Sequence, residues 1–142
     1  MNPPAAVVDT NVVVSGVLTS RPESPTVQIL DGMLKGQIPF LLSAELIAEY
    51  RAVLLRPKIR ERHRLKERAI DEILVELITN GRLREVEQSG STSLPAGDGH
   101  LWALLAREPS AVLVTGDLML IDHPPAGRTV LSPRAFLDLL EP

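Results

Sequence analysis

Four short apolar runs constrain the fold of this chain more than any other feature of the sequence. They are AAVV, PFLL, AVLV and RTVL, at 5–8, 39–42, 111–114 and 128–131. Each is largely apolar, contains β-branched or other bulky side chains, and is bounded by polar or turn-forming residues. This pattern is typical of strands that are buried on both faces. The sequence therefore predicts four buried strands.

Segments with helical patterns lie between these runs. Ser24 and Pro25 suit the start of a helix, and Gly36 suits its end. Further helices are predicted over 43–54, 66–81, 99–106 and 133–140, and a long irregular loop is predicted over 88–97. The alternation favours an α/β domain with a mostly parallel, twisted sheet of four to five short strands and helices on both faces.

The size and composition of the chain fit a single domain over residues 1–142. Apolar side chains make up 44% of the sequence and charged ones 23%, as expected for one compact core. There is no cysteine, which excludes disulfides, thiolate metal sites and a thiol nucleophile. No apolar run approaches the roughly 20 residues that span a bilayer. The first residues show no secretory signal, so we expect a cytoplasmic protein with no membrane association.

The charge distribution contrasts with the net charge of −3. Seven basic residues lie within 56–68, against two acidic ones: Arg56, Lys58, Arg60, Arg62, Arg64, Lys66 and Arg68. We hypothesise that Arg56, Lys58, Arg60, Arg62 and Arg64 form an RNA-binding rim, since phosphate contacts supply affinity independent of sequence. The alternative is a solvated helix, or a patch that pairs with an acidic partner.

Two acidic residues follow predicted strands directly or closely. Asp9 comes immediately after the first strand, and Asp117 comes three residues after the third. In an open α/β sheet, ligands bind beyond the carboxyl ends of the strands. Asp also caps helices and turns, so each residue alone has a purely structural alternative.

Two more acidic residues lie on helices near the apolar stripe. Asp98 precedes Leu101, Trp102 and Leu105 at helical spacings, which places its carboxylate on the inward stripe of that helix. Glu49 borders the apolar stripe of its own helix. We expect both to face the same crevice as Asp9 and Asp117.

Carboxylates that converge on one crevice repel one another unless a cation binds among them. Hard oxygen ligands without cysteine or clustered histidine suit Mg²⁺ or Mn²⁺. Such a site fits phosphodiester hydrolysis. The histidines are not spaced for zinc; His100, two residues after Asp98, has a structural role or contacts the substrate.

The sequence resembles the PIN-domain family, and in particular the VapC-like toxins of toxin–antitoxin pairs. VVDTNVVVSGVL is similar to the family's first strand and Asp-Thr-Asn motif, LLSAELIAEYRAVL to the second acidic segment, DGHLWALLA to the third, and VLVTGDLML to the Thr-x-Asp motif. Asp9, Glu49, Asp98 and Asp117 then map to the four acids, and Asn11, Ser43 and Thr115 to supporting positions.

The resemblance implies metal-dependent endonucleolytic cleavage of RNA, a homodimer and, for toxin members, a small antitoxin protein. One alternative is a non-catalytic RNA-binding or interaction module with the same fold. Another is a Mg²⁺-dependent phosphotransfer protein of the receiver or phosphatase type. Those proteins use a lysine from the later half of the chain, and the last lysine here is Lys66.

Overall fold

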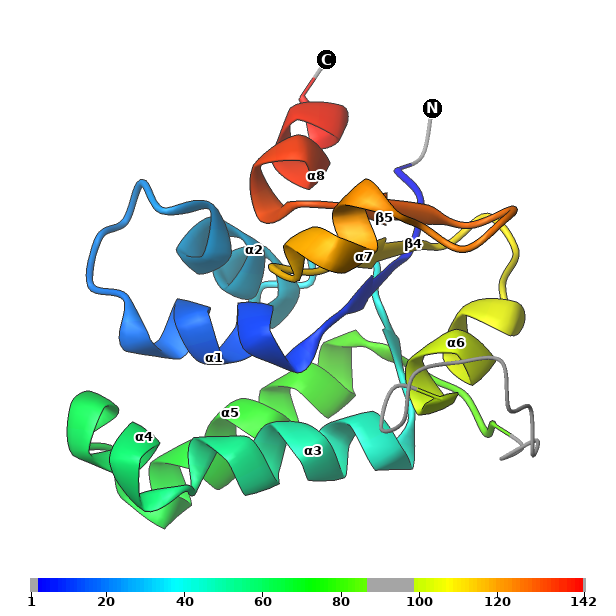
Figure 1. Ribbon diagram of the computed structural model, residues 1–142. Helices are drawn as coiled ribbons and strands as arrows, with labels where there is room; N and C mark the ends of the chain where they lie inside the picture. Colours follow the sequence, from blue (N-terminus) through cyan, green and yellow to red (C-terminus); the bar gives the residue numbers. More distant parts are fainter. Residues whose placement is uncertain (1–2, 87–98, 142) are drawn as a thin grey trace.

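Short parallel strands form the centre of the molecule. The computed structural model describes residues 3–86 and 99–141. Within them, β1 (Ala6–Val8), β4 (Val112–Val114) and β5 (Thr129–Leu131) form a parallel sheet in the order β1-β4-β5 (Figure 1). A second parallel pair consists of β2 (Leu41–Leu42) and β3 (Arg82–Leu83), and an isolated bridge between Ala6 and Phe40 links it to β1.

The four predicted strands are present and β3 is an addition. The predicted α/β class with a parallel sheet is confirmed. The sequence of β3 gave no signal because Arg82 and Leu83 are both exposed, so the apolar pattern of a buried strand is missing. Main-chain bonds to β2 and to the residue before it define this strand instead, from Arg82 N to Phe40 O at 2.9 Å and from Arg84 N, just after β3, to Leu42 O at 2.8 Å.

Helices surround the strands. The five predicted helices correspond to α2 (Pro25–Leu34), α3 (Ala44–Leu54), α5 (Glu67–Asn80), α6 (Gly99–Ala106) and α8 (Pro133–Leu140). Three more were not predicted: α1 (Thr10–Leu18), α4 (Pro57–His63) and α7 (Leu118–Asp122). The predicted loop over 88–97 lies outside the described residues.

Polar side chains at the helix starts explain where several helices begin. Ser43 accepts a hydrogen bond from Leu46 N at 3.1 Å and so caps α3, while Ser132 does the same for α8. Asp9 and Asp117 are the capping residues of α1 and α7. These bonds satisfy main-chain donors that the first helical turn leaves without partners.

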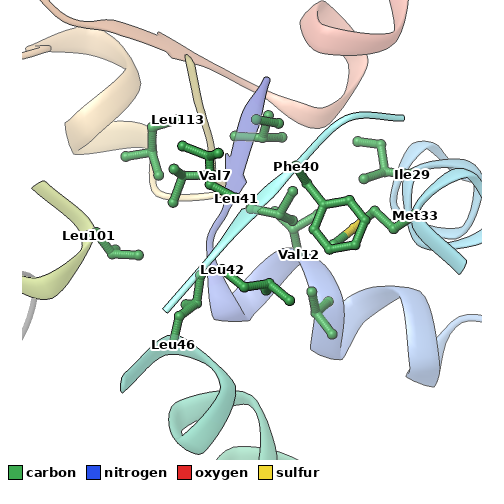
Figure 2. Close-up of a cluster of buried hydrophobic side chains, with 14 of the residues drawn as sticks. Val7, Val12, Ile29, Met33, Phe40, Leu41, Leu42, Leu46, Leu101 and Leu113 are labelled. Atoms are coloured by element: carbon green, nitrogen blue, oxygen red, sulfur yellow. The ribbon is translucent and has the colours of Figure 1, made fainter. Parts of the chain in front are cut away.

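The core lies between the strands and the helices on either side of them. In Figure 2, α2 contributes Ile29 and Met33 on one side of the strands, and α6 contributes Leu101 on the other. Val7 and Leu113 of the sheet lie between them, and all five side chains are buried. This packing fixes β1 and β4 side by side and so determines where the residues that follow them lie.

In the part of the chain that the structure describes, no helix is both long enough and apolar enough to cross a membrane.

Candidate active site

The carboxyl ends of β1 and β4 bring the first and last of the predicted acidic motifs together. Val8 and Val114 are register partners, so Asp9 and Thr115 emerge side by side. Asp9 N donates to Val114 O at 2.9 Å, and the Thr115 hydroxyl donates to Asp9 Oδ2 at 2.8 Å. Two segments 106 residues apart in sequence are thus joined at one point.

Asn11 extends this connection to the turn after β4. Its Oδ1 accepts a hydrogen bond from Gly116 N at 2.9 Å, and its Nδ2 lies 3.4 Å from both Asp9 Oδ2 and Thr115 Oγ1. Asp117 N in turn donates to Thr115 Oγ1 at 3.1 Å. The side chains of Asn11 and Thr115 therefore hold the two acidic turns in a fixed relation.

Asp9 and Asp117 have a structural role as well as a place in the site. Asp9 Oδ1 accepts from Thr10 N at 2.8 Å, and Asp117 Oδ1 accepts from Met119 N at 2.9 Å. Both carboxylates also line the same cleft. Capping and exposure to the cleft are thus compatible, since each carboxylate has two oxygens that accept several hydrogen bonds.

Glu49 reaches the site from α3. The Thr10 hydroxyl donates a short hydrogen bond to Glu49 Oε2, and His100 Nε2 lies 3.6 Å from Glu49 Oε1. The Glu49 side chain is 35% exposed and lines the cleft beside Asp9. Thr10 of α1 and His100 of α6 therefore lie beside different oxygens of the Glu49 carboxylate.

Tyr50 is a buried residue whose pKa is affected by the negative charge of the site. Its side chain is fully buried, and its hydroxyl donates to Val8 O at the end of β1. Burial raises the pKa of Tyr50 well above its ordinary value, and the negative charges of Asp9 and Glu49 raise it further. Tyr50 therefore stays protonated and ties α3 to the strand that carries Asp9.

The cleft has a volume of about 540 Å³ and contains both signs of charge. Asp9, Glu49 and Asp117 line it together with Arg56 and Arg62, two of the seven basic residues within 56–68, a segment that spans α4 and the start of α5. The other three predicted RNA-binding residues, Lys58, Arg60 and Arg64, are exposed and do not line this cleft.

The remaining predicted site residues lie elsewhere. Ser43 is fully buried at the start of α3, where it caps the helix that carries Glu49. Asp98 lies outside the described residues. Leu101, Trp102 and Leu105, which define the predicted inward stripe of its helix, are buried as expected.

The donor set suits a hard divalent cation. The cleft presents carboxylate, amide and hydroxyl oxygens, the ligand types that Mg²⁺ and Mn²⁺ prefer. Within residues 3–86 and 99–141, no group of three acidic or histidine side chains is gathered closely enough to hold a metal ion.

Sequence reasoning missed Thr10 and Tyr50 and gave His100 two readings. Thr10 had a usable signal, since it stands directly after Asp9 inside the Asp-Thr-Asn motif. Tyr50 and His100 had none of comparable strength, because their partners, Val8 and Glu49, lie 42 and 51 positions away in the sequence.

The structure combines a parallel α/β sheet with a carboxylate-lined cleft at the carboxyl ends of its strands. These features define a class of protein whose site can act on a ligand through a hard metal ion. The sequence matches the PIN domain family over residues 5–119, and the chain belongs to that family. PIN domains are in general metal-dependent nucleases, so membership indicates nuclease-type activity on nucleic acid with a divalent metal ion. A search of curated proteins found no match.

Proposed function

We propose that this chain is a Mg²⁺-dependent endoribonuclease that hydrolyses RNA phosphodiester bonds in the cytoplasm. The observation that carries the proposal is the cleft in which Asp9, Glu49 and Asp117 meet Arg56 and Arg62. Carboxylates alone would repel a polyanion. A metal ion among the carboxylates and two arginines beside them convert the cleft into a site for a phosphodiester.

Asp9 and Asp117 would hold the metal ion, with Asp98 as a further proposed ligand. Glu49 contributes negative charge and, with one oxygen bonded to Thr10, a fixed position beside Asp9. Mn²⁺ has the same ligand preference as Mg²⁺ and would substitute for it. When bound, such a cation activates a water molecule and stabilises the charge that develops on the phosphate.

The chain's own residues supply orientation and charge. Thr115 and Asn11 fix the Asp9 carboxylate through the hydrogen bonds between the two turns. Arg56 and Arg62 lie where they can hold the phosphate by charge-assisted bonds. Lys58, Arg60 and Arg64 would extend the same basic surface along flanking RNA.

We further propose that the protein is the toxin of a toxin–antitoxin pair, neutralised by a small antitoxin protein, and that it works as a homodimer. The resemblance of its four acidic segments to VapC-like toxins supports this role. The exposed apolar side chains of Val75 and Ile78 on α5 offer a surface for such contacts.

Cleavage of a structured RNA in Mg²⁺ and in EDTA tests the nuclease. The wild type should cut in Mg²⁺ or Mn²⁺ only. Asp9→Asn should lower kcat/KM on the order of a hundredfold or more, as expected for loss of a metal ligand. The matched control is Asp138→Asn, an exposed residue on α8, which should leave cleavage unchanged. RNA that is bound but not cut by the wild type would instead favour a non-catalytic RNA-binding module.

A further inference from the structure

A second hollow adjoins the cleft, and neither Arg56 nor Arg62 lines it. Its volume is about 390 Å³, and it shares Asn11, Ser15 and Asp117 with the cleft. These three residues therefore form a boundary between the two hollows. A linear ligand that lies over Asp117 can occupy both at once.

The two hollows differ in chemistry. Arg56 and Arg62 line the first, whereas no lysine or arginine lines the second among the residues that the structure describes. The second hollow has the hydroxyls of Ser15 and Thr26 beside the apolar side chain of Pro133. Such a surface is poorly suited to bind a phosphate and well suited to a sugar, whose hydroxyls need hydrogen bonds and whose carbon atoms need apolar contact.

Three hydroxyls form a chain at this hollow. Ser15 Oγ lies 3.0 Å from Thr26 Oγ1, which lies 3.2 Å from Ser24 Oγ. The three groups carry three O–H donors, and the two bonds between them use two. One donor, together with the acceptor lone pairs of the chain, remains for groups outside it. Ser24 precedes α2 in the capping position but makes no side-chain capping bond, so its hydroxyl serves this chain instead.

Gly16 allows the helices to approach closely enough for this chain of hydroxyl groups to form. A Cβ at this position would lie 2.9 Å from Thr26 O and 3.0 Å from Leu30 Cβ. Because glycine has no Cβ, α1 and α2 approach closely enough for Ser15 to reach Thr26, and the two helices lie side by side in Figure 1. The hydroxyl chain is thus built by the packing of α1 on α2.

We infer that the second hollow is a nucleotide subsite in which the hydroxyls of Ser15 and Thr26 bind the ribose 2′-OH of a nucleotide next to the cleaved bond. The inference rests on the proposed nuclease function and extends it, since it assigns the preference for RNA over DNA to named residues. The 2′-OH is the group by which a protein distinguishes the two polymers. RNA then runs from Arg56 and Arg62, over the carboxylates, into the hollow between α1 and α2.

The test compares binding of a fluorescein-labelled single-stranded 12-nucleotide RNA and the DNA of the same sequence by anisotropy. All proteins carry Asp9→Asn and are measured in Mg²⁺, so that the RNA stays intact. Thr26→Val keeps the shape of the side chain and removes the hydroxyl. It should weaken RNA binding about two- to tenfold, the effect of one lost hydrogen bond, and leave DNA binding unchanged. Thr26→Ser, which keeps a hydroxyl, should retain the RNA preference.

The matched control is Thr79→Val, because the Thr79 hydroxyl donates to Val75 O on α5 and lines neither hollow. Equal losses for RNA and DNA, or no loss with Thr26→Val in a protein that melts like its parent, would overturn the subsite. The outcome is separable from that of the proposed nuclease. If the wild type cuts RNA but Thr26→Val leaves the RNA preference unchanged, only the subsite is ruled out. If Thr26→Val abolishes the preference but the wild type does not cut RNA, only the nuclease is ruled out.

Discussion

Glu49 depends on a neighbour that belongs to a different helix. The hydroxyl of Thr10 donates to Glu49 Oε2, and Thr10 itself is buried at the start of α1. Thr10→Val should leave Glu49 without this donor and lower kcat/KM for RNA cleavage about ten- to a hundredfold, since hydrogen bonds to charged groups contribute roughly 1.5–3 kcal/mol. Thr10→Ser should restore most of the activity. If Thr10→Val cuts RNA at the wild-type rate, Glu49 needs no such positioning.

At the level of single residues, the sequence predicts the site residues that follow strands but not the contacts between residues far apart in the chain. Asp9, Thr115 and Asp117 could be placed because parallel strands end at one edge, and the structure joins their turns there. The contact between His100 and Glu49 depends on how α6 packs against α3, which no local pattern encodes. Of the seven basic residues within 56–68, only Arg56 and Arg62 line the cleft, and this selection depends on how α4 packs against α1, which no local pattern encodes.

Between elements, Arg51 of α3 ties α5 in place through Glu67 and Asp71, with Arg51 Nε 2.8 Å from Asp71 Oδ1. The hydrogen bond from Arg51 lowers the pKa of Asp71. A carboxylate whose pKa is lower in the folded state stabilises the fold at pH values above its unfolded value, near 3.8, and this contribution is lost as the pH falls through the folded pKa. Asp71→Asn should therefore lower the urea midpoint at pH 7, with the difference from the wild type shrinking below pH 4.

Glu72→Gln is the control for this experiment on the same helix. Glu72 pairs with Arg68 at 3.5 Å, but both side chains are largely exposed, so the pair is screened by water. Its removal should leave the midpoint nearly unchanged at every pH. Equal effects of the two substitutions would mean that the link between α3 and α5 contributes nothing specific.

A second prediction between elements concerns Gly81, which follows α5 and precedes β3. A Cβ there would lie 2.6 Å from Phe40 Cε2 and 2.8 Å from Leu42 Cδ1. Both side chains are fully buried, so they cannot move away freely. Gly81→Ala should destabilise the protein by about 1–3 kcal/mol, the usual cost of overpacking. Gly99→Ala, where a Cβ meets no atom within 4 Å, should have no such effect on urea unfolding.

The helices and the strand that were not predicted were missed for one physical reason. α1 contains three consecutive valines, a β-branched run that favours strands, yet the cap from Asp9 and the packing against α2 make it a helix. β3 is too short and too exposed to show a period. α4 and α7 have no fully buried residue, and with seven and five residues they are too short for a helical period to show in the sequence. Tertiary contacts, which a local pattern does not contain, decide such segments.

For the molecule as a whole, metal binding should raise the thermal stability of the fold. A ligand that binds only the folded state stabilises it by about 2.7 kcal/mol at a hundredfold excess over Kd. Thermal melts of the wild type should therefore shift upward from EDTA to Mg²⁺, and Asp9→Asn should show a smaller shift. In EDTA the variant should melt close to the wild type, because asparagine also caps helices and the removal of one negative charge offsets the loss of the oxygen that accepts from Thr115. An identical Mg²⁺ shift in both proteins would remove Asp9 from the metal site.

The pairing of β1 with β4 also sets the time at which this protein can become active during its synthesis. β1, which Asp9 follows, leaves the ribosome long before its neighbour in the sheet, which begins at Val112, and a bond that fixes Asp9 comes from Thr115. A nascent chain that lacks these residues cannot assemble the cleft, however well its early helices form. The cleft can therefore assemble only after residues 112–115 have been made and have left the ribosome.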